Sequence, residues 1–247
     1  MVIFETFNGC NLASLHTKCP VASPLRWQGA NTNQAMTDEK IIETAIRLRK
    51  EFNFNGFFAF HYFNEPSLAH NRNVKLINAI NSEIKSKFLL WTNGMFLHKL
   101  SIEEINLFDK IFISVYNQLN LDVLKNYKGE LNWRGSELDD RMNPPTEISE
   151  RPCLRMFTEM IFDFFGNQKL CCMAWQGKMS VGNLMTDKLE FLVERWINIR
   201  ETMLVKMEKN APDVCQSCGK RWDSLTNIEP SIQKLAQEYI DNKRQGI

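Results

Sequence analysis

Short apolar runs alternate with amphipathic segments along the first half of the chain, and this alternation limits the fold most strongly. Continuous apolar runs of this kind are typical of strands buried on both faces of a sheet. The runs cover residues 1–7, 57–63, 88–91 and 111–116. Helical patterns separate them: one begins with Thr37 as N-cap, and two others cover residues 71–86 and about 101–108. Strand and helix repeat about every 30 residues, which predicts a parallel β/α array, either a barrel or an open sheet.

Polar segments follow the apolar runs at the points where the predicted strands end. In parallel β/α arrays the reactive groups lie at the carboxyl ends of the strands. The four segments are the Cys10–Cys19 loop, Asn64-Glu65-Pro66, Thr92-Asn93-Gly94 and the stretch from Ser114 to Asn117. We therefore expect their side chains to converge on one face of the molecule.

Composition excludes several classes of function. The 247 residues carry a net charge of +1, so nothing global favours nucleic acid or an acidic membrane surface as a partner. No apolar stretch reaches ~18 residues, and the first residues do not resemble a signal peptide. We expect a cytoplasmic protein with no membrane segment.

A second unit is predicted to begin near Pro152, after a polar connection over residues 129–152. Phe165-Gly166-Asn167 is a turn signal between two short apolar segments, which predicts a hairpin with residues 169–175 as its return strand. A long amphipathic helix is predicted from Thr186 to Glu208. The predicted division is residues 1–150 for the β/α array and 151–247 for the small second domain.

Seven cysteines are many for a chain in a reducing compartment, where thiolates serve metal or redox chemistry more often than disulfides. Cys215-x-x-Cys218 is a turn that can direct two thiolates at one metal. Cys153 and Cys171 lie on either side of the predicted hairpin and complete four thiolates, which suits a tetrahedral site. An iron–sulfur cluster and zinc both remain open, and Cys172 has no assigned partner.

The order of these motifs resembles the auxiliary-cluster domain of radical S-adenosylmethionine enzymes, called SPASM in its full form and twitch in its short form. That domain shows a cysteine, a hairpin glycine followed by x4-Cys, a Gly-Asn pair, and Cys-x-x-Cys. Here these are Cys153, Gly166 with Cys171, Gly182-Asn183, and Cys215 with Cys218. No cysteine follows Cys218, so the resemblance is to the short form and implies one auxiliary [4Fe–4S] cluster.

The N-terminal half resembles the same superfamily. Asn64-Glu65-Pro66 is similar to its Gly-Glu-Pro strand end, with Asn64 in place of the usual glycine, and Thr92-Asn93-Gly94 matches its Thr-Asn-Gly. The resemblance implies that Glu65 receives the amino group of S-adenosylmethionine (AdoMet). It implies a cofactor-binding face made of Asn64, Glu65, Thr92, Asn93 and Ser114. The implied fold is a partial parallel (β/α) barrel with a small C-terminal auxiliary-cluster domain of hairpin and helix.

The first motif departs from the superfamily's Cys-x3-Cys-x2-Cys, and two registers are open. Without a gap, Ser14 and Thr17 stand at two cysteine positions, and neutral hydroxyls are poor iron ligands, so the cluster is lost. With a longer loop, the ligands are Cys10, His16 and Cys19. An imidazole ligand raises the potential of an iron–sulfur cluster, which opposes low-potential electron transfer.

The resemblance implies an enzyme that reductively cleaves AdoMet and abstracts a substrate hydrogen, oxidising or modifying a small molecule or a peptide. A small molecule is favoured, since no leader-binding extension is visible. The implied partners are that substrate and a low-potential electron donor such as flavodoxin or ferredoxin. The alternative is an iron–sulfur or zinc protein that does not cleave AdoMet and acts as a binding or scaffold protein.

Overall fold

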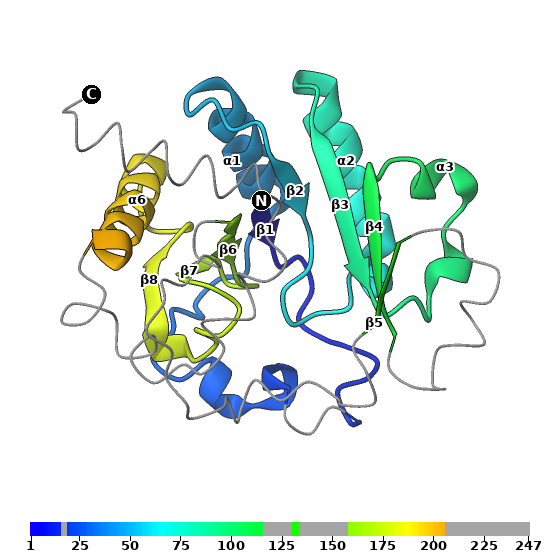
Figure 1. Cartoon of the computed structure of the whole chain (residues 1–247), viewed down its shortest axis with the longest axis horizontal. Coiled ribbons are helices and arrows are strands. Elements are labelled where there is room, and N and C mark those ends of the chain that lie inside the picture. Colours follow the sequence, from blue (N-terminus) through cyan, green and yellow to red (C-terminus); the bar gives the residue numbers. More distant parts are fainter. Residues whose placement is uncertain (16–18, 116–129, 134–157, 206–247) are drawn as a thin grey trace.

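The computed structural model of the chain describes residues 1–15, 19–115, 130–133 and 158–205. Eight strands in this part form one sheet in the order β5-β4-β3-β2-β1-β6-β7-β8 (Figure 1). The strands are β1 (Val2–Phe4), β2 (Phe57–Ala59), β3 (Lys87–Thr92), β4 (Lys110–Val115), β5 (Glu130–Trp133), β6 (Met160–Phe162), β7 (Asn167–Lys169) and β8 (Ser180–Asn183). The pairs from β5 to β6 are parallel, and β7 is antiparallel to both β6 and β8. This is an α/β fold with a mostly parallel sheet, a partial β/α barrel as predicted.

Helices connect the parallel strands and lie against one face of the sheet (Figure 1). The α-helices are α1 (Asp38–Lys50), α2 (His70–Glu83), α3 (Ile102–Ile105) and α6 (Leu189–Val205). The short 3-10 helices of the described residues are η1 (Pro20–Ala22), η2 (Pro24–Arg26), η3 (Pro66–Ala69), η4 (Leu97–Lys99) and η5 (Gly177–Met179). None of the described helices is long and apolar enough to cross a membrane.

The helix-covered face of the sheet holds the larger core. Side chains alternate between the two faces of a strand, so residues two apart share a face. The even-numbered residues of β1 and β2, such as Phe4 and Phe58, pack with Phe88 against buried side chains of α1 and α2. Phe4 stacks with Phe162 at a centroid distance of 5.7 Å, and Phe58 contacts Phe88 at 6.1 Å. Each fully buried side chain of this size contributes about 1.5–3 kcal/mol through the hydrophobic effect.

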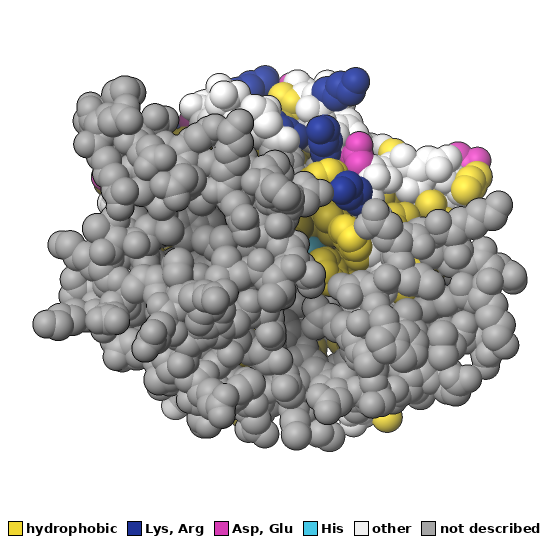
Figure 2. Space-filling model, viewed as in Figure 1, with side chains coloured by type: hydrophobic (Ala, Val, Ile, Leu, Met, Phe, Trp, Pro, Cys, Tyr) yellow, Lys and Arg dark blue, Asp and Glu magenta, His cyan; other side chains and the backbone are white. Residues whose placement is uncertain are grey.

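The opposite face of the sheet holds a second apolar cluster, here called the inner-face cluster. It comprises Ile3, Cys19, Ala59, Tyr62, Phe63, Leu89, Ile161 and Trp175, with Trp91, Phe112 and Cys172 packed against it. Cys19 and Cys172 are far apart in the sequence, yet both pack in this cluster and so lie on the same face of the sheet. Figure 2 shows hydrophobic side chains, with histidine among them, gathered near β3 on the face turned to the viewer.

The start of α1 confirms the predicted N-cap, because Thr37 Oγ1 accepts a 3.2 Å hydrogen bond from the backbone N–H of Lys40. Two acids follow in the first turn, where the helix dipole favours them. The predicted helices over 71–86 and 101–108 are present as α2 and as the single turn α3.

Three predictions on local structure are wrong. The predicted strand over 57–63 ends at Ala59, because the chain turns through Tyr62 and Asn64. The polar connection over 129–152 contains β5, which pairs in parallel with β4. The return strand of the hairpin is Asn167–Lys169, and the chain leaves the sheet before Cys171.

The hairpin continues the sheet of the barrel. β6 pairs in parallel with β1, with Phe4 opposite Phe162, and β7 then pairs antiparallel with β6. The turn needs Gly166, because its φ is +79° and residues with a Cβ rarely adopt this backbone conformation. The division at residue 150 stays a prediction, since residues 134–157 lie outside the described part.

Candidate functional site

Three predicted site residues meet at the carboxyl ends of β2 and β3. Glu65 Oε2 accepts a 2.8 Å hydrogen bond from the backbone N–H of Asn93, and Oε1 accepts one of 2.5 Å from the Thr92 hydroxyl. Ser67 adds two donors to Oε1, its backbone N–H at 3.0 Å and its hydroxyl at 2.6 Å. The carboxylate is 2% exposed, so these neighbours fix its position. The expected convergence of these strand ends is confirmed.

Burial raises the pKa of the Glu65 carboxyl above its ordinary value, because desolvation penalises the charged form. The hydrogen bonds from Asn93, Ser67 and Thr92 act in the opposite direction, since they stabilise the carboxylate. No cation is hydrogen-bonded to Glu65 among the described residues. A cationic group placed beside Oε2, which accepts one hydrogen bond, would favour the charged form further.

The turn after β3 presents Asn93 to this carboxylate. Gly94 has a φ of +78°, and its N–H donates to Thr92 Oγ1 at 3.0 Å. The N–H of Met95 donates to Asn93 Oδ1 at 3.0 Å. Thr92, Asn93 and Gly94 therefore form one locked turn, which explains why these three residue types occur together at a strand end.

The residues on either side of Cys10 are hydrogen-bonded to Glu65 and to Asn93. The carbonyl of Gly9 accepts a 2.9 Å hydrogen bond from the backbone N–H of Glu65. Asn11 Oδ1 accepts a 2.8 Å hydrogen bond from Asn93 Nδ2. The residues before and after Cys10 are thus bonded to Glu65, in the segment after β2, and to Asn93, in the turn after β3, respectively.

The Cys10 thiol is half-buried, and burial raises its pKa to about 11, with further contributions from the charges of Glu65 and Cys19. The backbone N–H of Leu12 donates to Cys10 Sγ at 3.4 Å and favours the thiolate. Cys171 repeats this arrangement, because its Sγ accepts from the N–H of Met173 at 3.4 Å. Hydrogen bonds from amides to sulfur are among the features that set the reduction potential of thiolate-ligated iron–sulfur clusters, so both contacts are compatible with a ligand role.

Of the other predicted metal ligands, the structure describes only one. Cys19 is buried in the inner-face cluster. His16, Cys153, Cys215 and Cys218 lie outside the described residues. Among the residues that the structure does describe, no group of three or more Cys, His, Asp or Glu side chains could hold a metal ion. The full ligand sets therefore stay predictions.

Asn64 and Ser114 make hydrogen bonds within the chain. Asn64 Oδ1 accepts from the N–H of Tyr62 at 2.8 Å, and its Nδ2 donates to the carbonyl of Phe60 at 2.9 Å, so the side chain closes the turn after β2. Ser114 Oγ accepts from the indole N–H of Trp91 at 2.8 Å. Both residues lie at the predicted strand ends, and their contact with a cofactor stays a prediction.

Sequence reasoning missed two groups at this end of the sheet. One is an aromatic wall on the inner face, where Trp91 contacts Phe112 at 5.1 Å and His61 at 5.7 Å between ring centroids. The other is a buried charge cluster, defined here as Glu5, Arg26, Asp163 and Lys169, all with fully buried side chains. A signal was present in the sequence, because Glu5 and Asp163 each directly follow a run of buried apolar strand residues.

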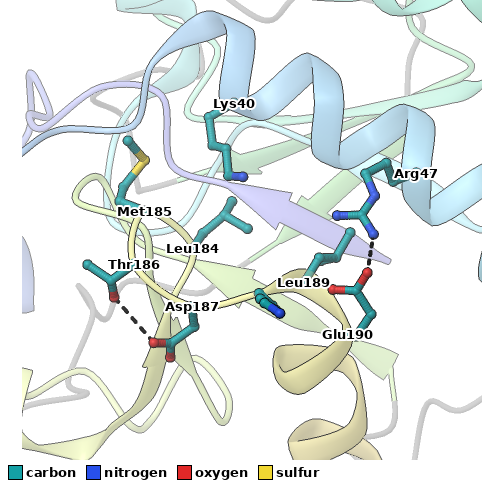
Figure 3. A pocket seen from close by; sticks show the side chains of 9 residues that line it. Lys40, Arg47, Leu184, Met185, Thr186, Asp187, Leu189 and Glu190 are labelled. Carbon is teal, nitrogen blue, oxygen red and sulfur yellow. Dashed lines mark hydrogen bonds and ion pairs between the residues drawn. The ribbon is translucent and has the colours of Figure 1, made fainter.

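A pocket of about 430 Å³ lies on the helix-covered side of the sheet, between α1 and the segment that joins β8 to α6 (Figure 3). Two of its lining side chains, Arg47 and Glu190, form an ion pair, and Lys40 is paired with Glu43 outside the lining. None of the predicted site residues lines it. The pocket is therefore separate from the candidate site.

No family model and no curated protein matches this chain. Solved structures do match in fold. The crystal structure of BtrN in complex with AdoMet and 2-DOIA matches at a TM-score of 0.63 and 18% identity, over 89% of this chain and 92% of that one. The structure of BtrN in an open conformation matches at a TM-score of 0.59 and 17% identity, over 89% of this chain and 91% of that one. Native anSMEcpe with bound AdoMet matches at 0.52, with 14% identity over 90% and 89%. Both proteins are radical S-adenosylmethionine enzymes, so this chain has a fold found in that superfamily.

Proposed function

We propose that this chain is a radical S-adenosylmethionine enzyme that binds AdoMet at the carboxyl ends of β2, β3 and β4. One observation carries the proposal: Gly9 and Asn11, on either side of Cys10, are hydrogen-bonded to Glu65 and Asn93. A predicted metal-ligating thiol and a predicted AdoMet-binding carboxylate are thereby built into one constellation. The fold shared with two AdoMet-bound structures supports this assignment.

Within this proposal Glu65 binds the AdoMet ammonium group. Its Oε1 already accepts three hydrogen bonds, whereas Oε2 accepts one and keeps acceptor capacity. The raised pKa of this buried carboxyl makes a cationic partner favourable, because the partner offsets the cost of burying the charge. Thr92 and Asn93 keep the carboxylate oriented while the ligand binds.

Cys10, His16 and Cys19 are the proposed ligands of the N-terminal cluster, and Cys153, Cys171, Cys215 and Cys218 those of an auxiliary one. When bound, a [4Fe–4S] cluster and AdoMet together supply the reductive cleavage that starts hydrogen abstraction. The chain's own contribution is to position both groups and to exclude water. The buried inner-face cluster, which includes Cys19, supports that second role.

The proposed substrate is a small molecule bound against the aromatic wall of Trp91, Phe112 and His61. Support comes from BtrN, whose crystal structure is a complex with AdoMet and 2-DOIA and matches this chain over 92% of its own length. The proposed partner is a low-potential electron donor such as flavodoxin or ferredoxin. A cytoplasmic location, where thiols stay reduced, is part of the same proposal.

The test is AdoMet binding to anaerobically reconstituted protein, measured by calorimetry for the native chain and for Glu65→Gln. The proposal expects binding by the native chain and at least tenfold weaker binding by the variant. Iron uptake without any AdoMet binding would instead favour a binding or scaffold protein. Zinc as the only bound metal would contradict both cluster assignments.

A further inference from the structure

The buried charge cluster has no part in the proposed AdoMet contacts, yet its two ion pairs lie next to the two cysteine-bearing segments in the sequence. Glu5 directly follows β1 and Asp163 directly follows β6, and these two strands pair in parallel with Phe4 opposite Phe162. The N–H of Glu5 donates to the carbonyl of Phe162 at 2.9 Å, which continues the pairing. Two fully buried carboxylates therefore end neighbouring strands at the same level.

Two buried cations neutralise these carboxylates, one from each cysteine-bearing segment. Arg26, in η2, is paired with Glu5. Lys169, in β7, lies 3.5 Å from Asp163 Oδ2 and also donates to Ser180 Oγ at 2.7 Å. Burial disfavours charges of either sign. It raises the pKa of the Glu5 carboxyl and lowers the pKa of the Lys169 amine. The opposite charges at close range offset the cost of burying these groups, together with backbone N–H donors to Glu5 and Asp163.

The ion pairs frame the cysteines in the sequence. Glu5 precedes Cys10 and Arg26 follows Cys19, so their contact closes the loop that contains both thiols. Lys169 is separated from Cys171 by Leu170 alone. Each pair therefore fixes the base of one cysteine-bearing segment.

Glu5 also joins the two pairs. Its Oε2 accepts a 3.0 Å hydrogen bond from the N–H of Phe164, the residue after Asp163. Its Oε1 accepts one of 3.0 Å from the N–H of Phe63, at the end of the segment after β2. The charges of Glu5 and Asp163 act on each other, because the Asp163 carboxylate contributes to the raised pKa of Glu5.

We propose that Glu5, Arg26, Asp163 and Lys169 form one positioning unit that fixes the Cys10–Cys19 loop and the Cys171–Cys172 segment relative to each other. The role of these cysteines as metal ligands rests on the proposed function, whereas the positioning itself does not. Removing one cation leaves two buried carboxylates with a single counter-charge. Both carboxylates are affected, so both segments loosen, including the one that keeps its own cation.

The test is backbone hydrogen exchange, followed by mass spectrometry, on the reduced, metal-free full chain. Reporter amides exist in both segments: Ala13 donates to the carbonyl of Cys10 at 3.1 Å, and Ala174 to that of Cys171 at 3.1 Å. In Arg26→Met and in Lys169→Met, both reporters are expected to exchange at least tenfold faster than in the native chain. Arg47→Met, which removes ion pairs on the helix-covered surface, is the matched control and leaves both reporters unchanged.

A charge-balanced variant separates this unit from a general loss of stability. Glu5→Gln combined with Arg26→Met removes one charge of each sign and leaves Asp163 with Lys169. In the double variant the amide of Ala174 is expected to recover its protection, while the amide of Ala13 still exchanges fast. Faster exchange confined to the segment that lost its cation, or no recovery in the double variant, would overturn the proposal.

Iron content of the same proteins after reconstitution keeps this proposal distinct from the proposed function. A native chain that takes up no iron, with the exchange pattern as expected, contradicts the proposed function and leaves the positioning unit intact. A native chain that takes up iron, with exchange in Arg26→Met limited to its own loop, contradicts the positioning unit alone.

Discussion

Asn93 Nδ2 donates a 2.8 Å hydrogen bond to Asn11 Oδ1, and this contact joins the end of β3 to the residue after Cys10. The backbone N–H of the same Asn93 donates to Glu65. A single residue therefore connects the predicted cluster loop with the predicted AdoMet-binding carboxylate. A substitution that moves Glu65 is therefore expected to shift the loop that contains Cys10, and the reverse.

Glu65→Gln is expected to weaken AdoMet binding by at least tenfold, about 1.4 kcal/mol. The amide cannot accept all four hydrogen bonds that the carboxylate accepts, because its nitrogen is a donor that faces other donors. It also carries no charge for the ammonium group. Calorimetric titration of reconstituted protein measures the change. Glu83→Gln, an exposed carboxylate at the end of α2, is the control, and equal losses in both variants would contradict the role given to Glu65.

The pH dependence of stability reports the buried state of Glu65 without any cofactor. Its pKa is raised in the folded protein above the ordinary value of 4.5, so the folded state binds the proton more tightly than the unfolded state does. Its contribution to stability is therefore fully present below about pH 4.5 and is lost as the pH rises through the raised pKa. Urea unfolding of metal-free protein should show native stability falling relative to Glu65→Gln as the pH rises above 4.5. A difference that does not change with pH would contradict the raised pKa.

Cysteine substitutions distinguish the metal ligands from the unassigned thiol. Native protein is expected to take up about eight irons per chain on anaerobic reconstitution, and Cys10→Ala about four, because one [4Fe–4S] cluster is lost. Cys172→Ala is the matched control and keeps the native count, since Cys172 packs against the inner-face cluster and is not among the proposed ligands. Iron analysis with cluster spectroscopy measures both. An unchanged number of irons per chain in Cys10→Ala would show that Cys10 does not hold a cluster.

Phe58→Ala tests the packing of the helix-covered face. The side chain is fully buried and contacts the rings of Phe4, Phe54 and Phe88. Its truncation is expected to lower the free energy of unfolding by about 3–5 kcal/mol. Phe191→Ala, at a ring that is 55% exposed on α6, should change it by less than about 0.5 kcal/mol. Similar losses at the two positions would mean that Phe58 does not occupy the core.

The sequence predicted those features that local chemistry determines. Continuous apolar runs indicated buried parallel strands, Thr37 marked the start of α1, and Thr92-Asn93-Gly94 marked a turn at the end of β3. The convergence of Glu65, Thr92 and Asn93 followed from strand direction alone, because parallel strands end on one side.

Features that depend on a distant partner were missed. β5 pairs with β4, and its four residues alternate polar and apolar side chains, a pattern too short to predict a strand within a polar stretch. β2 ends early because the Asn64 side chain bonds back to Tyr62 and Phe60, which the apolar run does not reveal. Glu5 and Asp163 look like ordinary charged residues at strand ends, and their partners Arg26 and Lys169 are recognisable only once the strands are placed side by side.

Release of 5′-deoxyadenosine measures directly whether this chain cleaves AdoMet. Reconstituted protein is incubated anaerobically with dithionite and AdoMet, and 5′-deoxyadenosine and methionine are quantified by chromatography, with Cys10→Ala and Cys172→Ala assayed in parallel. Both products are expected from the native chain and from Cys172→Ala, and neither above background from Cys10→Ala. A native chain that carries its full iron and binds AdoMet, yet releases no 5′-deoxyadenosine, would contradict the proposed function.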